Sequence, residues 1–439
     1  MLKSEGFKKY FFNTSWLFFE HIVRLVVALF VSVYVARYLG PDQYGLLNYS
    51  ISFVALFSAI ATLGLDQIVI RELVKDRNKR DSLLGTAFVL KVSGAVLAIA
   101  ILAVGVQFTS NDLFTNLLIF IIAAGTLFQS MNVVDFYYQS KVQSKFSVQV
   151  KFWTIMGISL LKVYSIYIGA PLLWFAFLVL LENIILASGF FLIYNLKGLS
   201  IFSWHFDLDM AKSLLKSSWP LIFSGIFIGI YMKIDQVMLK EMVDTQAVGL
   251  YAAAVKLSEA WYFVPTVIMT SFYPAIIEGK KISDEIYYQR LELLYGTVVW
   301  LAILIALPIT FLGDWVIQIL YGIDYVGAAS VLKIHIWAAV FVFIGVANSK
   351  WLIIENLEKF ALYRTMIGAL CNVVLNLMLI PKYGIEGAAT ATVISYFIAA
   401  YLSMLFIGPT QKNFWLSTKS FNLYILFKNL LRFLNERKI

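Results

Sequence analysis

The sequence predicts an all-α polytopic membrane protein with about twelve transmembrane helices. Of its 439 residues, 61% are hydrophobic and 14% are charged, and the mean hydropathy is +0.81. A soluble globular chain is only about 45–50% apolar. Apolar runs recur along the whole chain, and each is close to the ~20 residues that cross a bilayer core about 30 Å thick. These observations exclude a soluble enzyme or binding module.

Twelve segments meet this criterion of length and hydropathy. The first follows a basic stretch at 1–10, but it is too long for a signal peptide and lacks a small-residue cleavage site, so we interpret it as a retained span. An even number of spans places both termini on one side. In chain order, the predicted spans are 11–38, 44–65, 84–106, 114–136, 150–169, 171–194, 214–239, 248–277, 293–313, 330–354, 363–380 and 387–407.

The loop charges predict the orientation of these spans. All loop Lys and Arg residues except Lys240 and Lys382 fall on one predicted face. Basic loops stay on the cytoplasmic side, so both termini are expected there, in the plasma membrane, or the inner membrane of a Gram-negative cell. The net charge of +9 is then mostly a topology signal, and no nucleic-acid partner is needed to explain it.

A short internal repeat divides the spans into two halves. Ser15 and Trp16 open the first span as Ser218 and Trp219 open the seventh, and Gly45-Leu46 in the second span matches Gly249-Leu250 in the eighth. Six spans per half is an even number, which predicts a parallel repeat about an axis along the membrane normal. Chance coincidence is the alternative for so short a match.

The predicted domains follow from this cut and from the polar segment near 195–215. They are an N-lobe at 1–204, a C-lobe at 205–408 and a cytoplasmic tail at 409–439. Beyond Pro409, polar residues from Lys428 onward alternate with leucines at helical spacing, which predicts an amphipathic helix on the inner leaflet.

The most informative residues are cations inside the predicted spans. Each would cost roughly 2.5–3.5 kcal/mol at the centre of a lipid-facing helix, and seven together on the order of 20 kcal/mol. A water-filled cavity removes most of this penalty, so we expect an anionic substrate to pass these side chains. They are Arg24, Lys91, Lys162, Lys233, Lys256, Lys333 and Lys350.

Intrahelical ion pairs are the alternative for two of these cations. Glu20 precedes Arg24 by four residues, and Glu259 follows Lys256 by three, which are spacings that allow pairing. Lys233 differs, because Asp235 is two positions away and points to another helix face. Lys233 is therefore the sharpest candidate for a cavity cation.

Other embedded charges have structural explanations that compete with a role in transport. Lys162 and Glu182 have similar depths in neighbouring spans, which allows an interhelical bridge. Lys91, Lys333 and Lys350 lie nearer span ends and could snorkel to the interface. The candidate substrate-binding cations are Arg24, Lys233, Lys256, Lys162 and Lys91. The candidate coupling or ion-pair acids are Glu20, Asp235, Glu259 and Glu182. We interpret Asp66 and Asp135 as boundary residues of the spans.

Glycine and proline mark candidate bending points. Gly225 and Gly229 make the seventh span easier to bend, and Pro265 removes a backbone hydrogen bond from the eighth. Close packing of small residues is the alternative explanation for the glycines. No metal site or cofactor is expected, because Cys371 is the single cysteine and no Cys/His cluster has ligand spacing. His205, in a polar loop, is interpreted as a surface residue.

Several segments resemble the Wzx-type polysaccharide flippase family. They include Gly40-Pro41-Asp42-Gln43-Tyr44-Gly45 and Asp135-Phe136-Tyr137-Tyr138-Gln139. The matching segments, in order, are 36–49, 63–73, 135–141, 218–221, 233–236, 248–254 and 375–389. The resemblance covers about 16–404, which leaves only the ends of the chain uncovered.

The resemblance implies the fold of the multidrug/oligosaccharidyl-lipid/polysaccharide (MOP) exporter superfamily, with two six-helix lobes in a V around a central cavity. It also implies a substrate, an undecaprenyl-diphosphate-linked oligosaccharide repeat unit moved to the outer leaflet by alternating access. The matching cations are Arg24, Lys233 and Lys256. The lipid bilayer and other polysaccharide assembly proteins are the implied partners, and a coupling ion stays open.

Three other classes of protein compete with a flippase. A drug or cation antiporter of the MATE type would favour acidic side chains in the cavity. A membrane-embedded polymerase or transferase would need a large outer loop or a motif of acids and histidines, and the predicted outer loops are short. A channel usually needs repeated pore-lining rings. The excess of embedded cations favours the flippase, which is not an enzyme.

Overall fold

The chain is an all-helical membrane protein. A computed structural model describes residues 5–426, 428 and 429, with side chains from residue 22 onward except at 77, 270 and 271. Within these limits the chain forms helices and turns without a strand. Among the described residues, ten helical stretches are long and apolar enough to cross a membrane. The predicted fold class, a polytopic bundle of helices, is confirmed.

Ten stretches account for twelve predicted spans because two of them are double. The stretch Ile22–Leu56 covers parts of the first two spans, and Lys359–Phe406 covers the last two. Each contains one glycine with a positive φ, Gly40 at 72° and Gly384 at 55°, where the helical backbone is interrupted. Glycine adopts this conformation without the steric cost of a Cβ. Both breaks lie where the sequence predicts a loop.

The described residues form two compact units, Met1–Val237 and Met238–Ile439. The helices of the first unit are α1 (Glu5–Leu56), α2 (Ser58–Thr62), α3 (Asp66–Lys75), α4 (Arg80–Gly105), α5 (Leu113–Phe128), α6 (Val133–Ser140), α7 (Lys145–Tyr167), α8 (Leu172–Leu196) and most of α9 (Leu208–Met242).

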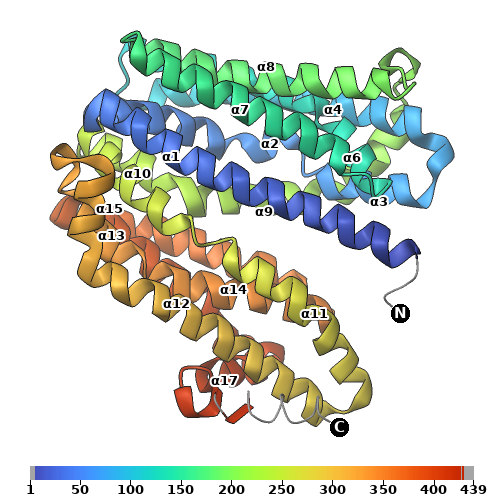
Figure 1. Cartoon of the computed structure of the whole chain (residues 1–439), viewed down its shortest axis with the longest axis vertical. Helices are drawn as coiled ribbons and strands as arrows, with labels where there is room; N and C mark the ends of the chain where they lie inside the picture. The colour runs from blue at the N-terminus through green and yellow to red at the C-terminus, as the bar shows by residue number, and fades with distance from the viewer. Residues whose placement is uncertain (1–4, 427, 430–439) are drawn as a thin grey trace. The chain divides into compact units, whose positions relative to one another are not determined.

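Long apolar helices pack side by side in the first unit. α7 lies along α1 and α8, and α5 packs on α8 (Figure 1). Around α3, α4 and α6 a buried cluster forms from residues such as Leu84, Val133 and Phe190. These helices are apolar on most faces, as expected of chains whose other neighbour is lipid.

α9 packs with the first unit, although it is the first span of the predicted C-lobe. A Cβ on Gly225 would lie 2.8 Å from the Cβ of Ala59, and Gln236 accepts a 2.8 Å hydrogen bond from Ser52. Glycine lets the two backbones approach closely, which favours helix association in membranes. The division into transport lobes at 1–204 and 205–408 stays a prediction.

The second unit contains eight helices besides the end of α9. They are α10 (Thr245–Glu259), α11 (Val264–Ile282), α12 (Asp284–Tyr321), α13 (Ala328–His335), α14 (Ala338–Ile354), α15 (Lys359–Phe397), α16 (Ser403–Phe406) and α17 (Gln411–Lys419). A π-helical turn, Ile398–Leu402, follows α15.

The core of the second unit forms around the first half of α12. Its buried residues include Ile276 of α11, Val298 of α12 and Phe343 of α14, each 0% exposed. α17 joins this core through Phe414 and Leu416. The start of the predicted tail is therefore packed into the unit and is not a free surface helix. The end of the predicted amphipathic stripe, 430–439, lies outside the described residues.

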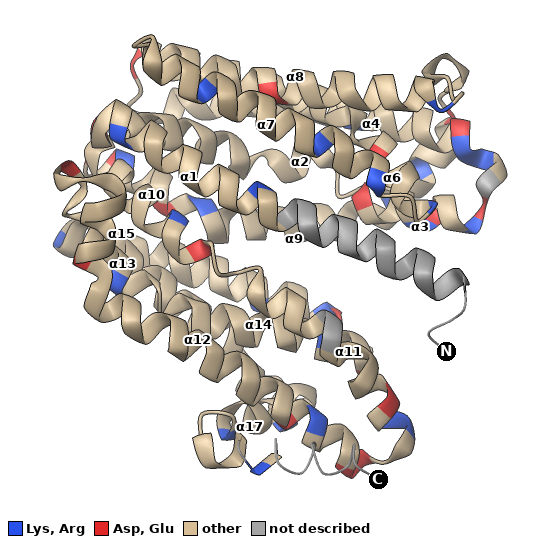
Figure 2. Ribbon diagram, viewed as in Figure 1, with Lys and Arg blue, Asp and Glu red and all other residues tan. Residues whose placement is uncertain are grey.

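Charged residues gather where helices turn. Figure 2 shows them around α3 and at the turn between α11 and α12. α12 carries none between Glu292 and Asp314, a stretch long enough to cross the hydrocarbon core. This distribution is typical of helices whose middle sections lie in lipid and whose ends meet water.

Candidate functional site

Lys233 is the embedded cation that stands out in the structure. It is half-buried on α9, nine residues before Met242, or about 13 Å from the end of the helix at 1.5 Å per residue. Lys233 forms no hydrogen bond or ion pair with any residue that the structure describes. An ammonium at this depth needs water or an anion, because the hydrocarbon core offers neither.

The helical wheel of α9 fixes the direction of Lys233. Gly225, Gly229 and Gln236 form one face, which packs against Ser52, the backbone of Ala55, and Ala59. Lys233 lies on one edge of this face, and Asp235, which is 3% exposed, lies about 160° away around the helix. Lys233 and Asp235 thus lie on opposite edges, as their spacing predicts.

The predicted bending points behave differently from one another. α9 is continuous through Gly225 and Gly229, and both glycines serve close packing against α1 and α2. A hinge at these glycines stays a prediction. Pro265 lies at the start of α11, directly after a break in the predicted eighth span between Glu259 and Val264.

Lys91 is held in a buried ion pair. Its Nζ donates to Asp66 Oδ1 at 2.8 Å and lies 4.7 Å from the centroid of the Phe136 ring. The Lys91 side chain is 2% exposed, so the expected snorkelling of this residue is wrong. Asp66, interpreted from sequence as a boundary residue, is its counter-ion. A lysine neutralised within the bundle is a weaker candidate for a substrate contact than Lys233.

The other predicted cations occupy separate positions. Lys162 of α7 pairs with Glu182 of α8 at 3.5 Å, which confirms the interhelical bridge. Arg24 is exposed on α1, and the side chain of Glu20 lies outside the described residues. Lys256 and Glu259 are half-buried at the end of α10.

Lys333 and Lys350 also have local partners. Lys333 pairs with Asp314 of α12. Lys350 is exposed, and its ammonium lies 5.9 Å from the centroid of the Tyr273 ring. Both lie near helix ends, in agreement with the structural explanation given from the sequence.

Sequence reasoning missed two further buried charges. Asp135 is 6% exposed and pairs at 2.7 Å with Lys151, at the start of the predicted fifth span. Arg364, at the start of the predicted eleventh span, is 9% exposed and donates to Ser349 Oγ at 2.7 Å. Its position four residues before Gly368, with Asn372 four further on, is a helical polar stripe that could have been recognised.

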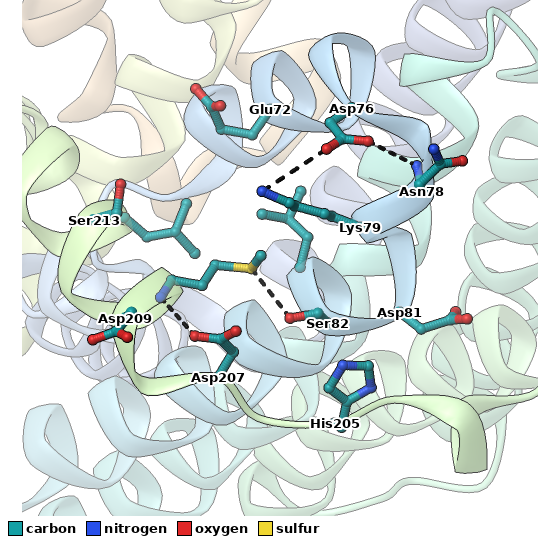
Figure 3. Close-up of a pocket in the computed structure, with 13 residues that line it drawn as sticks. Glu72, Asp76, Asn78, Lys79, Asp81, Ser82, His205, Asp207, Asp209 and Ser213 are labelled. Atoms are coloured by element: carbon teal, nitrogen blue, oxygen red, sulfur yellow. Dashed lines mark hydrogen bonds and ion pairs between the residues drawn. The ribbon is translucent and has the colours of Figure 1, made fainter.

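A polar pocket of about 630 Å³ opens in the first unit, between the turn that joins α3 to α4 and the start of α9 (Figure 3). Its carboxylates come from Glu72, Asp76, Asp81, Asp207 and Asp209, and Lys79 is the lysine among the lining residues. Burial acts to raise the pKa of Glu72, but hydrogen bonds from Lys75 and Arg71 outweigh it and lower the pKa. Lys79, Arg80 and Lys212 pair with Asp76, Asp81 and Asp209, so cations balance most of the carboxylates of this pocket.

His205, Asp207 and Asp209 all belong to the polar segment between the predicted halves. The backbone of His205 passes within 2.7 Å of where a Cβ on Gly85 would lie, so this segment is seated on α4. His205 itself is exposed, as expected. Among the described residues, no group of three or more His, Cys, Asp or Glu side chains is arranged to hold a metal ion.

Solved structures identify the class of this fold. An inward-facing MATE family transporter of the MOP superfamily matches with a TM-score of 0.68 at 15% identity, covering 90% of this chain and 96% of the other. The lipid II flippase MurJ, in an inward closed conformation, matches with a TM-score of 0.68 at 19% identity, covering 97% and 93%. The chain has the fold of the MOP superfamily of transporters.

The sequence identifies the family within this class. The chain belongs to the polysaccharide biosynthesis protein family, whose model matches residues 11–280. The probable flippase AglR of Haloferax volcanii is 23% identical, over 88% of this chain and 81% of AglR. The resemblance to MOP-superfamily polysaccharide flippases is confirmed.

Proposed function

We propose that this protein is a flippase that moves an undecaprenyl-diphosphate-linked oligosaccharide repeat unit from the inner to the outer leaflet of the plasma membrane. Its family is defined by polysaccharide biosynthesis, and the related AglR is a probable flippase. The same fold serves MurJ, a flippase of lipid II. A lipid-linked glycan is the substrate class that these relationships favour.

Lys233 is the observation that carries the proposal. An ammonium inside a span with no partner among the described residues costs roughly 2.5–3.5 kcal/mol on insertion scales, which a structural role would not offset. A diphosphate supplies the missing negative charge during passage. Lysine suits this role because its ammonium is a compact charge on a flexible stem and can follow a moving phosphate.

The transport cycle in this proposal breaks no covalent bond. The diphosphate and sugars pass polar side chains in a hydrated cavity between the lobes 1–204 and 205–408, while the polyprenyl tail stays in lipid. Rocking of the lobes exposes the cavity to each side in turn. Arg24 and Lys256 are further contacts in this proposal, and arginine adds the ability to hold two phosphate oxygens at once.

We expect Lys233→Ala to lower the initial translocation rate about tenfold or more, because a charge-assisted phosphate contact contributes about 1.5–3 kcal/mol. Lys233→Arg should keep most of the rate. The measurement is translocation of an undecaprenyl-diphosphate-linked oligosaccharide in proteoliposomes, read by access of an added glycosidase. Lys216→Ala, an exposed lysine on the same helix, is the matched control. Wild-type translocation by Lys233→Ala would contradict the assignment of this residue.

A drug or cation antiporter is the second candidate, because the MATE transporter matches with the same TM-score as MurJ. Lys233 argues against it, since an organic cation would be repelled at this position. Proteoliposomes that accumulate a cationic dye and fail to move the lipid-linked glycan would favour the antiporter and overturn the flippase.

A further inference from the structure

Two transmembrane segments of the second unit are each interrupted by a short turn in which amides bond three residues back, and these two breaks meet. The eighth predicted span is interrupted between α10, which ends at Glu259, and α11, which begins at Val264. The tenth is interrupted between α13, which ends at His335, and α14, which begins at Ala338. Ser258 and His335, the residues at these two breaks, are hydrogen-bonded to each other and are 0% and 1% exposed.

The contact satisfies a carbonyl that the second break sets free. In a regular helix the amide of Ala339 would bind the carbonyl of His335, but it donates to Ile336 instead, at 3.1 Å. The Ser258 hydroxyl donates to the His335 carbonyl at 3.3 Å. Hydroxyl side chains are a common means of satisfying such groups inside membranes. The break is therefore a built feature of this unit.

The imidazole completes the contact. His335 Nδ1 lies 3.0 Å from Ser258 Oγ. The Ser258 hydroxyl thus lies within hydrogen-bond distance of both the carbonyl and the imidazole of His335. The Tyr251 ring stands edge-on to the imidazole with centroids 6.1 Å apart, and its hydroxyl lies 3.2 Å from Thr392 Oγ1. This cluster joins α10, α13 and α15.

A third helix carries a proline at the same level. Pro308 interrupts the hydrogen bonding of α12, because it lacks an amide and its ring disturbs the preceding turn. Trp337, within the break between α13 and α14, donates through Nε1 to Thr310 Oγ1 at 3.1 Å. Side-chain hydrogen bonds thus link the two breaks to each other and to Thr310, two residues after Pro308, in one layer across the unit.

The hydrophobic cluster around the first half of α12 lies on one side of this layer. It contains Met269 and Ile276 of α11, residues of the first half of α12, and Ala339 to Leu352 of α14. Among the described residues, it contains none of α10 or α13. The segments on one side therefore share one hydrophobic cluster, and α10 and α13 pack outside it, against α12 and α15.

We infer that the second unit has an internal hinge, and that the contact between Ser258 and His335 holds the two breaks together at this hinge. α11, α14 and the first half of α12 rotate together about this layer relative to α10 and α13. Because Lys256 lies two residues before Ser258, the Ser258–His335 contact also fixes the position of the end of α10, where Lys256 lies. The inference goes beyond the proposed function and does not depend on the transported substrate.

Spin-label distances in the reconstituted full chain test the hinge, in a Cys371→Ser background. Labels at Val326 and Ile353, both exposed, report across the α13–α14 break, and labels at Ile282 and Ile353 report between the two segments of one body. We expect Ser258→Ala to broaden the Val326–Ile353 distance distribution about twofold and to leave the Ile282–Ile353 distribution narrow, as hinge rotation requires. Ser258→Thr, which keeps the hydroxyl, should restore the wild-type width.

Ser330→Ala is the matched control, because Ser330 is a half-buried serine on α13 whose hydroxyl donates to the Gly327 carbonyl, at the start of the same helix. A Val326–Ile353 distribution in Ser258→Ala as narrow as in this control would overturn the hinge. Equal broadening of both label pairs would also overturn it, because α11 and α14 would then not move as one body. If Ser258→Ala does not fold, His335→Asn is measured with the same labels. A Val326–Ile353 distance distribution no wider than in the control would then contradict the role of the Ser258–His335 contact.

Discussion

Asp66→Asn is expected to lower the free energy of unfolding by about 3 kcal/mol, because it leaves the buried ammonium of Lys91 without its counter-ion. The Lys91 side chain is 2% exposed and lies where α4 packs on α3 and α6. Partial exposure of the Asp66 side chain, at 47%, places the effect at the low end of the range for buried pairs. Thermal unfolding in detergent, followed by tryptophan fluorescence, measures it.

Two further variants separate charge burial from other effects of this substitution. The double change Asp66→Leu with Lys91→Met removes both charges and should recover most of the lost stability. Asp209→Asn breaks the exposed pair of Asp209 and Lys212, 3.7 Å apart, and should change stability by less than about 1 kcal/mol. If Asp66→Asn and Asp209→Asn lower the free energy of unfolding equally, the Lys91–Asp66 pair contributes no more to stability than an exposed pair.

Asn348→Leu is expected to cost roughly 2–4 kcal/mol and to detach α17 from the second unit. Asn348 Oδ1 accepts from Tyr295 at 2.6 Å and from Asn413 at 2.7 Å, and its Nδ2 donates to the Ala400 carbonyl at 2.6 Å. All three side chains are 0% exposed. Leucine has a similar size, so the amide of Asn413 and the carbonyl of Ala400 lose their partners without a large cavity.

Limited trypsin digestion reports this detachment directly. Lys412 and Lys419 flank the buried residues of α17, and cleavage at both should accelerate in Asn348→Leu. Asn422→Leu, at an exposed asparagine that caps only the Tyr424 amide, is the control and should leave digestion unchanged. Protection of Lys412 and Lys419 equal to wild type would show that the Asn348 hydrogen bonds do not hold α17.

The number and position of the spans could be predicted because the bilayer imposes them. A segment must be about 20 apolar residues long, and its backbone must bond to itself, whatever its neighbours are. The breaks at Gly40 and Gly384 were also readable, since both coincide with predicted loops. The interruption after Ser258 has a local signal in Pro265, but the one after His335 has none, because it depends on a hydroxyl from another helix.

The state of the embedded charges could be predicted only in part. The bridge between Lys162 and Glu182 follows from two charges at similar depth in consecutive spans. Lys91 pairs with Asp66, 25 positions earlier in the chain, and Asp135 pairs with Lys151. Turns separate the members of each pair, and the hydropathy pattern does not predict the geometry of these turns. Spacing alone separates Lys233 from Asp235, and the structure agrees with this separation.

The sequence by itself determined the class of protein, the approximate spans, the family resemblance and the position of Lys233 within α9. Hydropathy and helix spacing are local properties, so the order of residues along the chain is enough to specify them. The tertiary structure decided which cations are neutralised, that α9 packs with the first unit, and that two broken spans are joined at Ser258 and His335. Each of these depends on which helix lies beside which, and that choice is made by packing among surfaces that are nearly equally apolar.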